Sequence, residues 1–209
     1  MLKAERLDYQ KNEGLDLGNL FKNPFEQFQH WFDFAVQSDA FYANAMTLAT
    51  VKNNKPHTRV VLLKELDEKG FTFFTNYESA KSKEIGENKN AALLFFWKEN
   101  ERQIRIEGVL EKVSDKISED YFKTRPRESQ IGAWASPQSE TITRAELEKR
   151  VEEFNQKFLN QEVPRPPFWG GFRLVPQRFE FWQGRSGRLH DRFVYEERNN
   201  VWEIYQIAP

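Results

Sequence analysis

The chain has 209 residues, of which 39% are hydrophobic and 15% aromatic, and this length and apolar content suit one domain with a sizeable core. Its formal net charge of -1 argues against a general binder of nucleic acid or membrane surfaces, because both functions draw on a large excess of positive charge. The sequence contains no cysteine and 3 histidines, which argues against a metal site, and we expect a soluble, cytoplasmic protein.

The first 22 residues are charged and irregular, and Gly14 and Gly18 break any helical pattern, so we expect a mobile N-terminal arm over residues 1–22. Asn23 and Pro24 then supply a preferred cap and a first-turn proline, which predict the start of a helix. Its apolar stripe at helical spacing consists of Phe25, Phe28, Phe32 and Val36, broadened by Trp31 and Ala35. This helix is expected to pack one face on the core.

From residue 45 the sequence changes to short β-rich runs separated by turn residues, the pattern of an antiparallel meander or barrel. We expect strands over residues 45–51, 58–66, 71–76, 91–97 and 102–113, and a short helix capped by Ser79 that ends near residue 88. The run 91–97 is the longest apolar one and is too short to span a bilayer.

The strand predicted over residues 58–66 has a cation near each end of an apolar middle. Alternation places Arg59 and Lys64 on opposite faces, so that one strand would serve two neighbouring anions. The alternative is that both side chains simply extend to water from the ends of a buried strand.

Another cluster of polar side chains surrounds Pro126. Ser114 caps a predicted helix over residues 115–124, and Tyr121, Arg125 and Ser129 would share one face if the helix continued past the proline. Two hydroxyls and a guanidinium are the donors that a phosphate monoester needs, although a capped helix end with a solvated basic tail is the alternative. Residues 131–139 indicate an apolar loop, after which a capping box predicts a helix over residues 144–159.

The last strands are expected to begin at residue 169 and to end with residues 201–207. Residues 179–193 predict a β-hairpin with its link at 185–187, which would place Arg188, His190 and Arg192 on one face of the second strand. Three such groups repel one another unless an anion separates them, which indicates an anion site around an imidazole. A basic edge strand exposed to solvent is the alternative.

The sequence contains no Gly-rich dinucleotide motif, P-loop or serine nucleophile elbow, so any phosphate is expected to be held by side chains. A series of other motifs follows in order: Arg59-Val-Val-Leu-Leu-Lys64, Phe74-Thr75-Asn76, Glu101-Arg102-Gln103, the run from Tyr121 to Trp134, Gln138-Ser139, Trp169-Gly-Gly171, Glu180-Phe-Trp-Gln-Gly184 and Arg188-Leu-His-Asp-Arg192. Together, from about residue 24 to Pro209, they closely resemble the pyridoxamine 5′-phosphate oxidase family.

This resemblance implies a mainly β fold with flanking helices, an FMN-binding split β-barrel formed by a single domain over residues 23–209. It also implies a homodimer with FMN in the subunit interface. The expected activity is oxidation of pyridoxamine 5′-phosphate and pyridoxine 5′-phosphate to pyridoxal 5′-phosphate in vitamin B6 salvage. Dioxygen would be the acceptor, with release of hydrogen peroxide and, from the amine, of ammonia.

The family positions that contact FMN resemble Arg59, Val60, Val61, Leu62, Leu63, Lys64, Phe74, Thr75, Lys81, Gln103, Gln138, Ser139, Trp182 and Arg192. Those that contact substrate resemble Lys64, Tyr121, Arg125, Ser129, Arg188, Leu189 and His190, of which Arg188 and His190 are expected to be catalytic, and Arg6 and Tyr9 resemble lid residues. The chain departs from the family pattern at Ala80, where a second basic residue is expected beside Lys81, and in the arm from Gly14 to Leu20, which lacks an arginine-rich stretch.

Two other functions remain open at this point. One is a different flavin enzyme on the same barrel, such as a reductase that uses a reduced nicotinamide or deazaflavin, because one fold can host several chemistries. The other is a carrier that binds FMN or pyridoxal phosphate without turnover.

Overall fold

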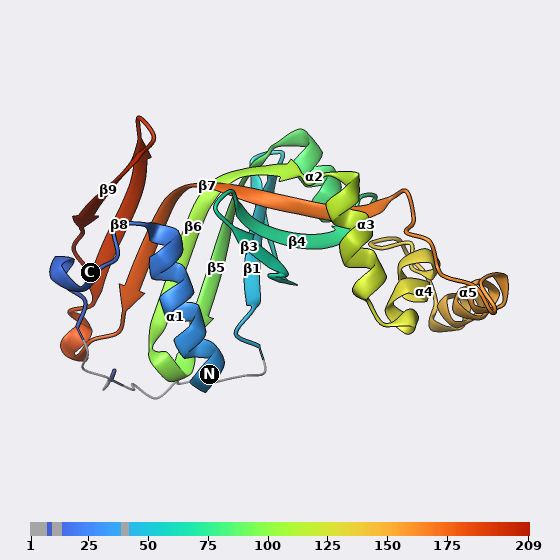
Figure 1. Cartoon of the computed structure of the whole chain (residues 1–209), viewed down its shortest axis with the longest axis horizontal. Helices are drawn as coiled ribbons and strands as arrows, with labels where there is room; N and C mark the ends of the chain where they lie inside the picture. The colour runs from blue at the N-terminus through green and yellow to red at the C-terminus, as the bar shows by residue number, and fades with distance from the viewer. Residues whose placement is uncertain (1–7, 10–13, 39–41) are drawn as a thin grey trace.

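A long antiparallel sheet forms the body of the protein (Figure 1) in a computed structural model that describes residues 8–9, 14–38 and 42–209. Its strands are β1 Ala45–Lys52, β2 Lys55–Leu62, β3 Glu65–Asp67, β4 Gly70–Asn76, β5 Asn90–Trp97, β6 Arg102–Lys112, β7 Trp169–Gln183, β8 Asp191–Arg198 and β9 Val201–Gln206. The helices are α1 Pro24–Ser38, α2 Ala80–Glu87, α3 Asp115–Thr124, α4 Arg127–Ala135 and α5 Arg144–Lys157, with single 3-10 turns at Leu17–Asn19, Lys98–Asn100 and Ser186–Arg188. The expectation of a mainly β fold with flanking helices is confirmed.

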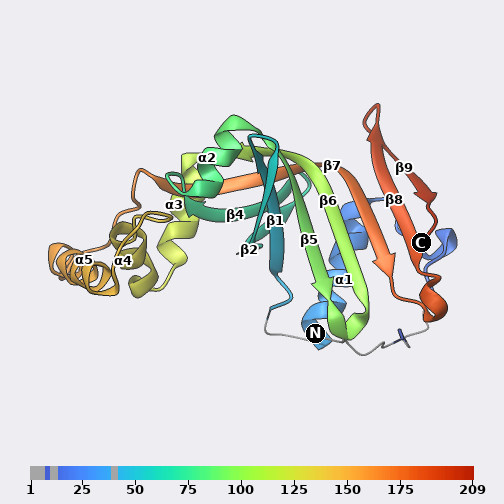
Figure 2. The same ribbon diagram turned by 180° about the vertical axis from the view of Figure 1, so that it is seen from behind.

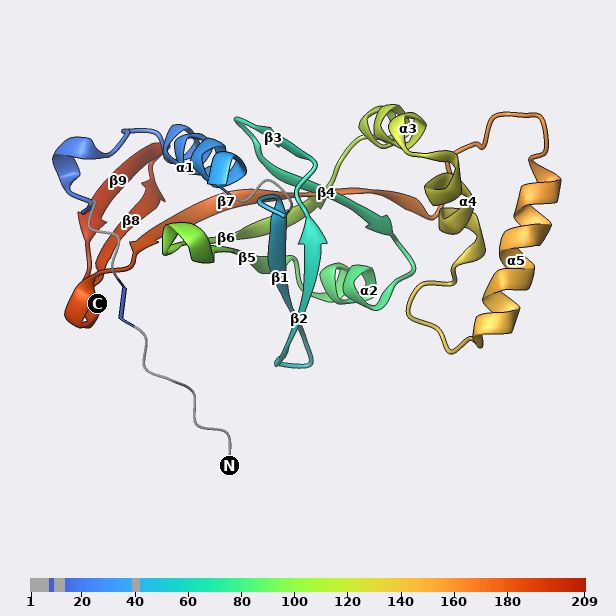
Figure 3. The ribbon, with the colours of Figure 1, turned by 90° about the horizontal axis from the view of Figure 1, so that it is seen from below.

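Strand β7 organises the sheet, in which the strand order is β2-β1-β5-β6-β7-β4-β3 and β8 and β9 continue from β7. The first part of β7 pairs with β4 and its last part with β8, while β6 runs beside both parts. Helices α3, α4 and α5 gather near the start of β7, whereas β8 and β9 lie at its other end (Figure 3). One strand therefore connects the two ends of the molecule.

Helix α1 covers the main core on one face of the sheet, as seen from behind in Figure 2. Its start is the predicted one, because the Asn23 side chain accepts a hydrogen bond from the Phe25 N–H at 2.8 Å. Phe28, Trp31 and Ala35 are buried, and the Phe28 ring packs edge-on against Phe71. The predicted stripe is wrong at Val36, which is 40% exposed because it lies past the edge of this buried face.

Three predicted elements differ from the structure. The strand predicted over residues 58–66 divides into β2 and β3, with Leu63 and Lys64 between them. Residues 131–135, predicted as loop, belong to helix α4. The runs predicted separately at residues 169–175 and 179–184 belong to one continuous strand, β7. Helix α4 forms because it packs against a smaller core of Phe122, Ile131, Phe158, Val163 and Trp169. This tertiary packing stabilises a helix that the local sequence pattern does not indicate.

The described part of the arm contacts the rest of the protein. The Leu15 N–H donates to the Asp191 carboxylate at 3.0 Å, and Tyr9 packs on the connection between β7 and β8. Arg6, expected to act with Tyr9 as a lid, lies outside the described residues. No helix among residues 14–38 and 42–209 is long and apolar enough to cross a membrane.

Candidate active site

A pocket of about 250 Å³ opens between β2, β4, α3 and the segment after α4. We call its lining the pocket half: Val60, Val61, Leu62, Lys64, Phe74, Thr75, Lys81, Tyr121, Arg125, Gln138 and Trp169. Every one of these residues except Trp169 was expected to contact FMN or substrate. Segments far apart in sequence thus meet at one place.

One wall of the pocket is a stack of three aromatic rings. Phe74 lies parallel to Tyr121 with ring centroids 4.0 Å apart, and parallel to Trp169 with centroids 5.6 Å apart. Gly171 allows this packing, since a Cβ at that position would lie 2.9 Å from the Phe74 ring. Such a wall suits a flat heteroaromatic ligand. Trp169 was not predicted as a site residue, and its only signal in the sequence was the motif that it begins.

Arg125 lies at the break between α3 and α4, where Pro126 disfavours helical geometry at the preceding residue. The centre of its guanidinium lies 4.6 Å from the Trp169 ring, and its Nη1 is buried without a hydrogen-bond partner among the described residues. Burial lowers the pKa of the Arg125 guanidinium, an effect that Tyr121 partly opposes. Because a buried N–H without a partner costs about 1–3 kcal/mol, the site fits an anionic acceptor such as phosphate.

The alignment predicted for Tyr121, Arg125 and Ser129 is wrong in its geometry, because Arg125 ends α3 and Ser129 belongs to the separate helix α4. Tyr121 and Arg125 nevertheless meet in the pocket, while Ser129 is not part of its lining. Substrate contact by Ser129 stays a prediction.

Lys81 forms the cationic end of the pocket half. Its Nζ donates to Thr75 Oγ1, Ser79 Oγ and Gln138 Oε1 at 3.1, 3.2 and 3.1 Å. Burial lowers the pKa of the Lys81 ammonium, Arg59 lowers it further, and Glu84 partly opposes both. A half-buried cation whose contacts are neutral oxygens favours an anionic ligand, and the phosphate of FMN fits this chemistry.

Ala80 is where the basic residue was expected, at the start of α2. Its N–H donates to Ser139 Oγ at 3.1 Å, and it lines a separate hollow of about 210 Å³ together with Lys52, Lys83, Glu84, Gln138, Ser139 and Glu140. Ser139 is therefore placed next to Lys81 and Gln138, in keeping with the implied phosphate site.

Arg59 is not part of the pocket lining. Its guanidinium donates to the buried Glu84 carboxylate at 2.7 Å and to Thr50 Oγ1 at 2.5 Å. Lys64 does line the pocket, but it lies beyond the end of β2, so the expected placement of the two cations on opposite faces of one strand is wrong. That each of them serves an anionic ligand stays a prediction. The Leu63 side chain is buried in the main core.

A second group of the implied site residues lies at the far end of β7. Gln103 on β6 pairs with Trp182 on β7, which pairs with Arg192 on β8, so the three form one row across the sheet. We call this row, together with Arg188, Leu189 and His190 in the adjoining connection, the strand-end half.

The connection before β8 corrects the predicted hairpin. Strand β8 begins at Asp191, and Arg188 ends a 3-10 turn with φ of 60°, so Arg188, His190 and Arg192 do not share one strand face. The turn ends next to the His190 ring, which lies 4.7 Å from Trp182 and 5.3 Å from Tyr9, ring centre to ring centre. Leu189 is exposed.

The electrostatics of His190 follow from its contacts. Its Nδ1 accepts the Arg185 backbone N–H at 3.1 Å, which leaves the hydrogen of the neutral ring on Nε2. Burial is the main cause that lowers the pKa of His190, and Arg188 lowers it further, while Asp191 and Asp8 oppose the shift. A neutral imidazole can therefore present an N–H donor beside the Arg188 cation.

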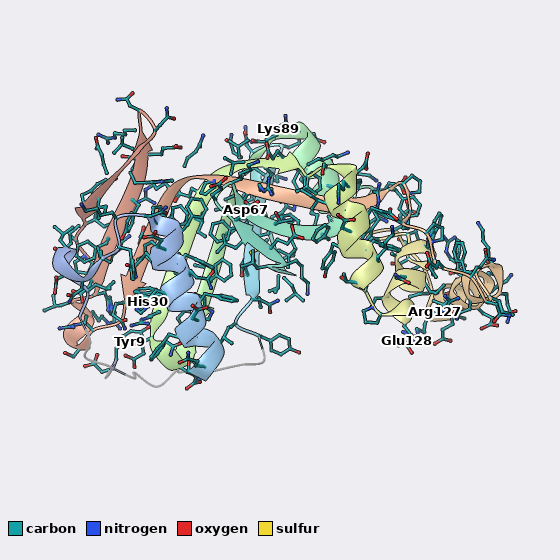
Figure 4. All side chains as sticks on the ribbon, in the orientation of Figure 1. Tyr9, His30, Asp67, Lys89, Arg127 and Glu128 are labelled. Carbon is teal, nitrogen blue, oxygen red and sulfur yellow. The ribbon has the colours of Figure 1, made fainter. Side chains whose placement is uncertain are left out.

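Parts of the two halves are far apart along one strand. Trp169 of the pocket half begins β7 and Trp182 of the strand-end half lies one residue before its end, which corresponds to roughly 40 Å along an extended strand. Figure 4 shows Tyr9, which packs on Trp182, and Arg127 on α4 at opposite ends of the molecule. Val60 of the pocket half and Gln103 of the strand-end half, by contrast, lie on nearby strands of the sheet.

Comparisons with known proteins show the family to which the chain belongs. Residues 36–158 match the family described as pyridoxamine 5'-phosphate oxidase, and residues 169–209 match the pyridoxine 5'-phosphate oxidase C-terminal dimerisation region. The pyridoxine/pyridoxamine 5'-phosphate oxidase of Nostoc punctiforme is 54% identical over 200 residues, which cover 94% of each chain. That of Microcystis aeruginosa is 51% identical over 207 residues, covering 98% of this chain and 96% of the other.

Solved structures show the same fold. PhzG from Burkholderia lata, in complex with tetrahydrophenazine-1-carboxylic acid, has a TM-score of 0.88 at 29% identity and covers 94% of this chain and 98% of its own. A pyridoxamine 5'-phosphate oxidase-related, FMN-binding protein from Nostoc punctiforme has a TM-score of 0.73 at 18% identity, covering 91% and 100%. The expected split-barrel fold is confirmed, and the chain belongs to the pyridoxine/pyridoxamine 5′-phosphate oxidase family.

Proposed function

We propose that this protein oxidises pyridoxamine 5′-phosphate and pyridoxine 5′-phosphate to pyridoxal 5′-phosphate, with FMN as cofactor and dioxygen as final acceptor. Its role would be vitamin B6 salvage. The observation that carries the proposal is the buried, unpartnered Nη1 of Arg125 beside the aromatic wall of the pocket. It supplies a donor for a phosphate next to a surface for a flat ring, and the curated relatives carry the name of this activity.

Each part of the pocket half has a task in this proposal. Lys64, Tyr121 and Arg125 bind the substrate phosphate, since an ammonium, a phenol and a guanidinium can all donate hydrogen bonds to such an anion. Lys81, Thr75, Gln138 and Ser139 bind the FMN phosphate at the start of α2. Arg59, held by Glu84, adds positive charge nearby.

The strand-end half completes the site in a homodimer, with FMN in the subunit interface. Gln103, Trp182 and Arg192 contact the cofactor, while Arg188 and His190 position the reacting edge of the substrate through their N–H groups. When bound, FMN supplies the two-electron acceptor that these side chains lack, and dioxygen yields hydrogen peroxide. Water releases ammonia from the amine substrate. The protein contributes orientation, phosphate binding and exclusion of solvent.

The test of this function is anaerobic. The purified protein is loaded with FMN, pyridoxine 5′-phosphate or pyridoxamine 5′-phosphate is added, and the visible absorption of the flavin is followed while pyridoxal 5′-phosphate is assayed. We expect bleaching with matching product, reversed by air with release of hydrogen peroxide. Pyridoxine without its phosphate is the control, and it should bleach the flavin far more slowly.

A flavin that binds but stays oxidised with both substrates would contradict the proposal. Bleaching by a reduced nicotinamide or deazaflavin in the same cell would then favour a reductase. A flavin that none of these donors reduces would favour a carrier.

A further inference from the structure

Glu180 is a buried carboxylate near the end of β7, with a side chain only 2% exposed. Three guanidinium groups surround it: Arg192 at 2.7 Å, Arg105 at 3.2 Å and Arg178 at 3.6 Å. A buried carboxylate is retained only where partners compensate for its lost hydration, so this position has a specific electrostatic role. None of the site assignments made above includes it.

The contacts of Glu180 with Arg192 differ from those with the other two arginines. Arg192 donates through both Nε, at 2.9 Å, and Nη2, at 2.7 Å, to the same oxygen, Oε1. Arg105 and Arg178 approach the other oxygen, Oε2, and both also pair with Glu107, at 2.8 and 3.1 Å. In the described residues, Glu180 is the only carboxylate paired with Arg192, whereas the other two arginines have a second one.

The C-terminal residues hold the remaining side of the same guanidinium. Arg192 Nη1 donates to the Ala208 carbonyl at 2.9 Å, and the Ile207 N–H donates to the Arg192 carbonyl at 3.0 Å. A guanidinium has five N–H donors in a fixed plane, and three are occupied by these contacts. The other two, one on Nη1 and one on Nη2, have no partner within the described ranges.

We propose that Glu180, assisted by the Ala208 carbonyl, is the positioning residue that fixes the Arg192 guanidinium so that its two remaining N–H groups are presented to acceptor atoms of FMN. The inference rests on the proposed function, in which Arg192 contacts the cofactor. A side chain that is already immobilised loses less rotamer freedom when the ligand binds, so Glu180 contributes to FMN affinity without touching FMN.

The test compares apo proteins by FMN titration, with the quenching of flavin fluorescence as the readout. We expect Glu180→Gln to weaken FMN binding by about tenfold or more, because it replaces a charge-assisted pair by a neutral one. Glu107→Gln is the matched control: it removes a carboxylate from the same charged cluster without touching Arg192, and its FMN affinity should stay within about twofold of wild type. Thermal unfolding of each apo variant shows any general loss of stability.

A double-variant cycle tests whether Glu180 acts through Arg192. If it does, Glu180→Gln combined with Arg192→Ala binds FMN no more weakly than Arg192→Ala alone, because the positioned group is already absent. Independent, additive losses would overturn the inference, as would equal losses in Glu180→Gln and Glu107→Gln.

The outcomes also separate this inference from the proposed function. Weak FMN binding in Arg192→Ala beside wild-type binding in Glu180→Gln defeats the inference alone. Wild-type binding in Arg192→Ala removes Arg192 from the cofactor site and defeats the inference together with that one assignment, while the oxidation itself is decided by the anaerobic experiment. Should Glu180→Gln fail to fold, deletion of Ala208 and Pro209 removes the acceptor of Nη1 and leaves Glu180 in place. That truncated protein should bind FMN more weakly at an unchanged apo unfolding temperature, and unchanged FMN affinity would contradict the inference.

Discussion

Among single residues, Arg125 is the one on which substrate affinity is expected to depend most. Its Nη1 is buried without a partner, and a substrate phosphate would satisfy it. Arg125→Ala should therefore raise the KM for pyridoxine 5′-phosphate by about tenfold or more, equivalent to about 1.4 kcal/mol. Steady-state kinetics at saturating FMN measure this effect.

The neighbouring Arg127 provides a matched control for that experiment. Its guanidinium donates to the carbonyls of Phe158 and Gln161 and is not part of the pocket half. Arg127→Ala should lower stability while leaving KM near the wild-type value. A wild-type KM in Arg125→Ala, or equal increases in both variants, would remove the phosphate-binding role from Arg125.

His190 gives the folded protein a defined dependence on pH. Burial and then Arg188 hold the pKa of His190 below its ordinary value of 6.5, so an unfolded chain takes up this proton at a higher pH than the folded one. The stability that the neutral ring contributes is full above about pH 6.5 and is lost as the pH falls through the lowered folded value. Protonation also places a hydrogen on Nδ1. This hydrogen replaces the lone pair with which Nδ1 accepts the Arg185 N–H in the neutral ring, so that hydrogen bond is lost.

Urea unfolding of the apo protein between about pH 5 and 8 tests this sign. The stability of wild type relative to His190→Gln should decrease as the pH falls through and below the usual histidine range. A stability difference between wild type and His190→Gln that is constant over this range would contradict the assignment.

At the scale of elements, local sequence chemistry predicted boundaries well where the signal is itself local. The Asn23 cap begins α1, and the Thr143–Glu146 capping box begins α5. Each of these features is decided by the residues that form it, so one short stretch of sequence contains the information.

The same local reasoning failed where distant packing decides the structure. The sequence indicated separate runs at residues 169–175 and 179–184, yet β7 continues through Pro176 at a bulge opposite Gly108, where a proline without an N–H is tolerated. A Cβ at Gly108 would approach the Val175 carbonyl too closely, so the partner strand makes room. The continuity of β7, and with it the distance between the two halves of the site, depends on residues about seventy positions apart and has no local signature.

The aromatic wall is an element-level feature that a single methyl group can disturb. A Cβ at Gly171 would lie 2.7 Å from Val113 Cγ2 and 2.9 Å from Phe74 Cε1. Gly171→Ala should therefore displace Phe74, raise KM and destabilise the fold by about 1–3 kcal/mol. Urea unfolding together with kinetics measures both effects.

Gly86 is the control for this substitution, because a Cβ there meets nothing within 4 Å and the residue lies in α2. Gly86→Ala should stabilise the protein by up to about 1 kcal/mol, since alanine is the better helix former, and leave KM unchanged. Equal behaviour of the two variants would show that the close approach to Phe74 has no role in the site.

For the whole molecule, the face of the sheet opposite α1 carries the features of a subunit interface. Val60, Leu62 and Phe96 are 66%, 39% and 53% exposed, and Phe96 pairs with Gln103, the first residue of the strand-end row. Exposed apolar residues next to site residues favour association at this place. The sequence motifs predicted nearly all residues of the pocket half, but spacing along one chain contains no signal that they work with residues of a second chain.

Purified heterodimers, selected through two different tags, test this composite site. One subunit carries Arg125→Ala in the pocket half and the other Arg188→Leu in the strand-end half, and activity is measured at a substrate concentration well below the KM of Arg125→Ala, where each homodimer is expected to have little activity. If each site takes one half from each subunit, one of the two sites contains no substitution, and the heterodimer should regain about half of wild-type activity. As a control, Arg125→Ala paired with Lys64→Ala alters both pocket halves and should regain none. Failure to recover activity in the first pair would place each active site within a single chain.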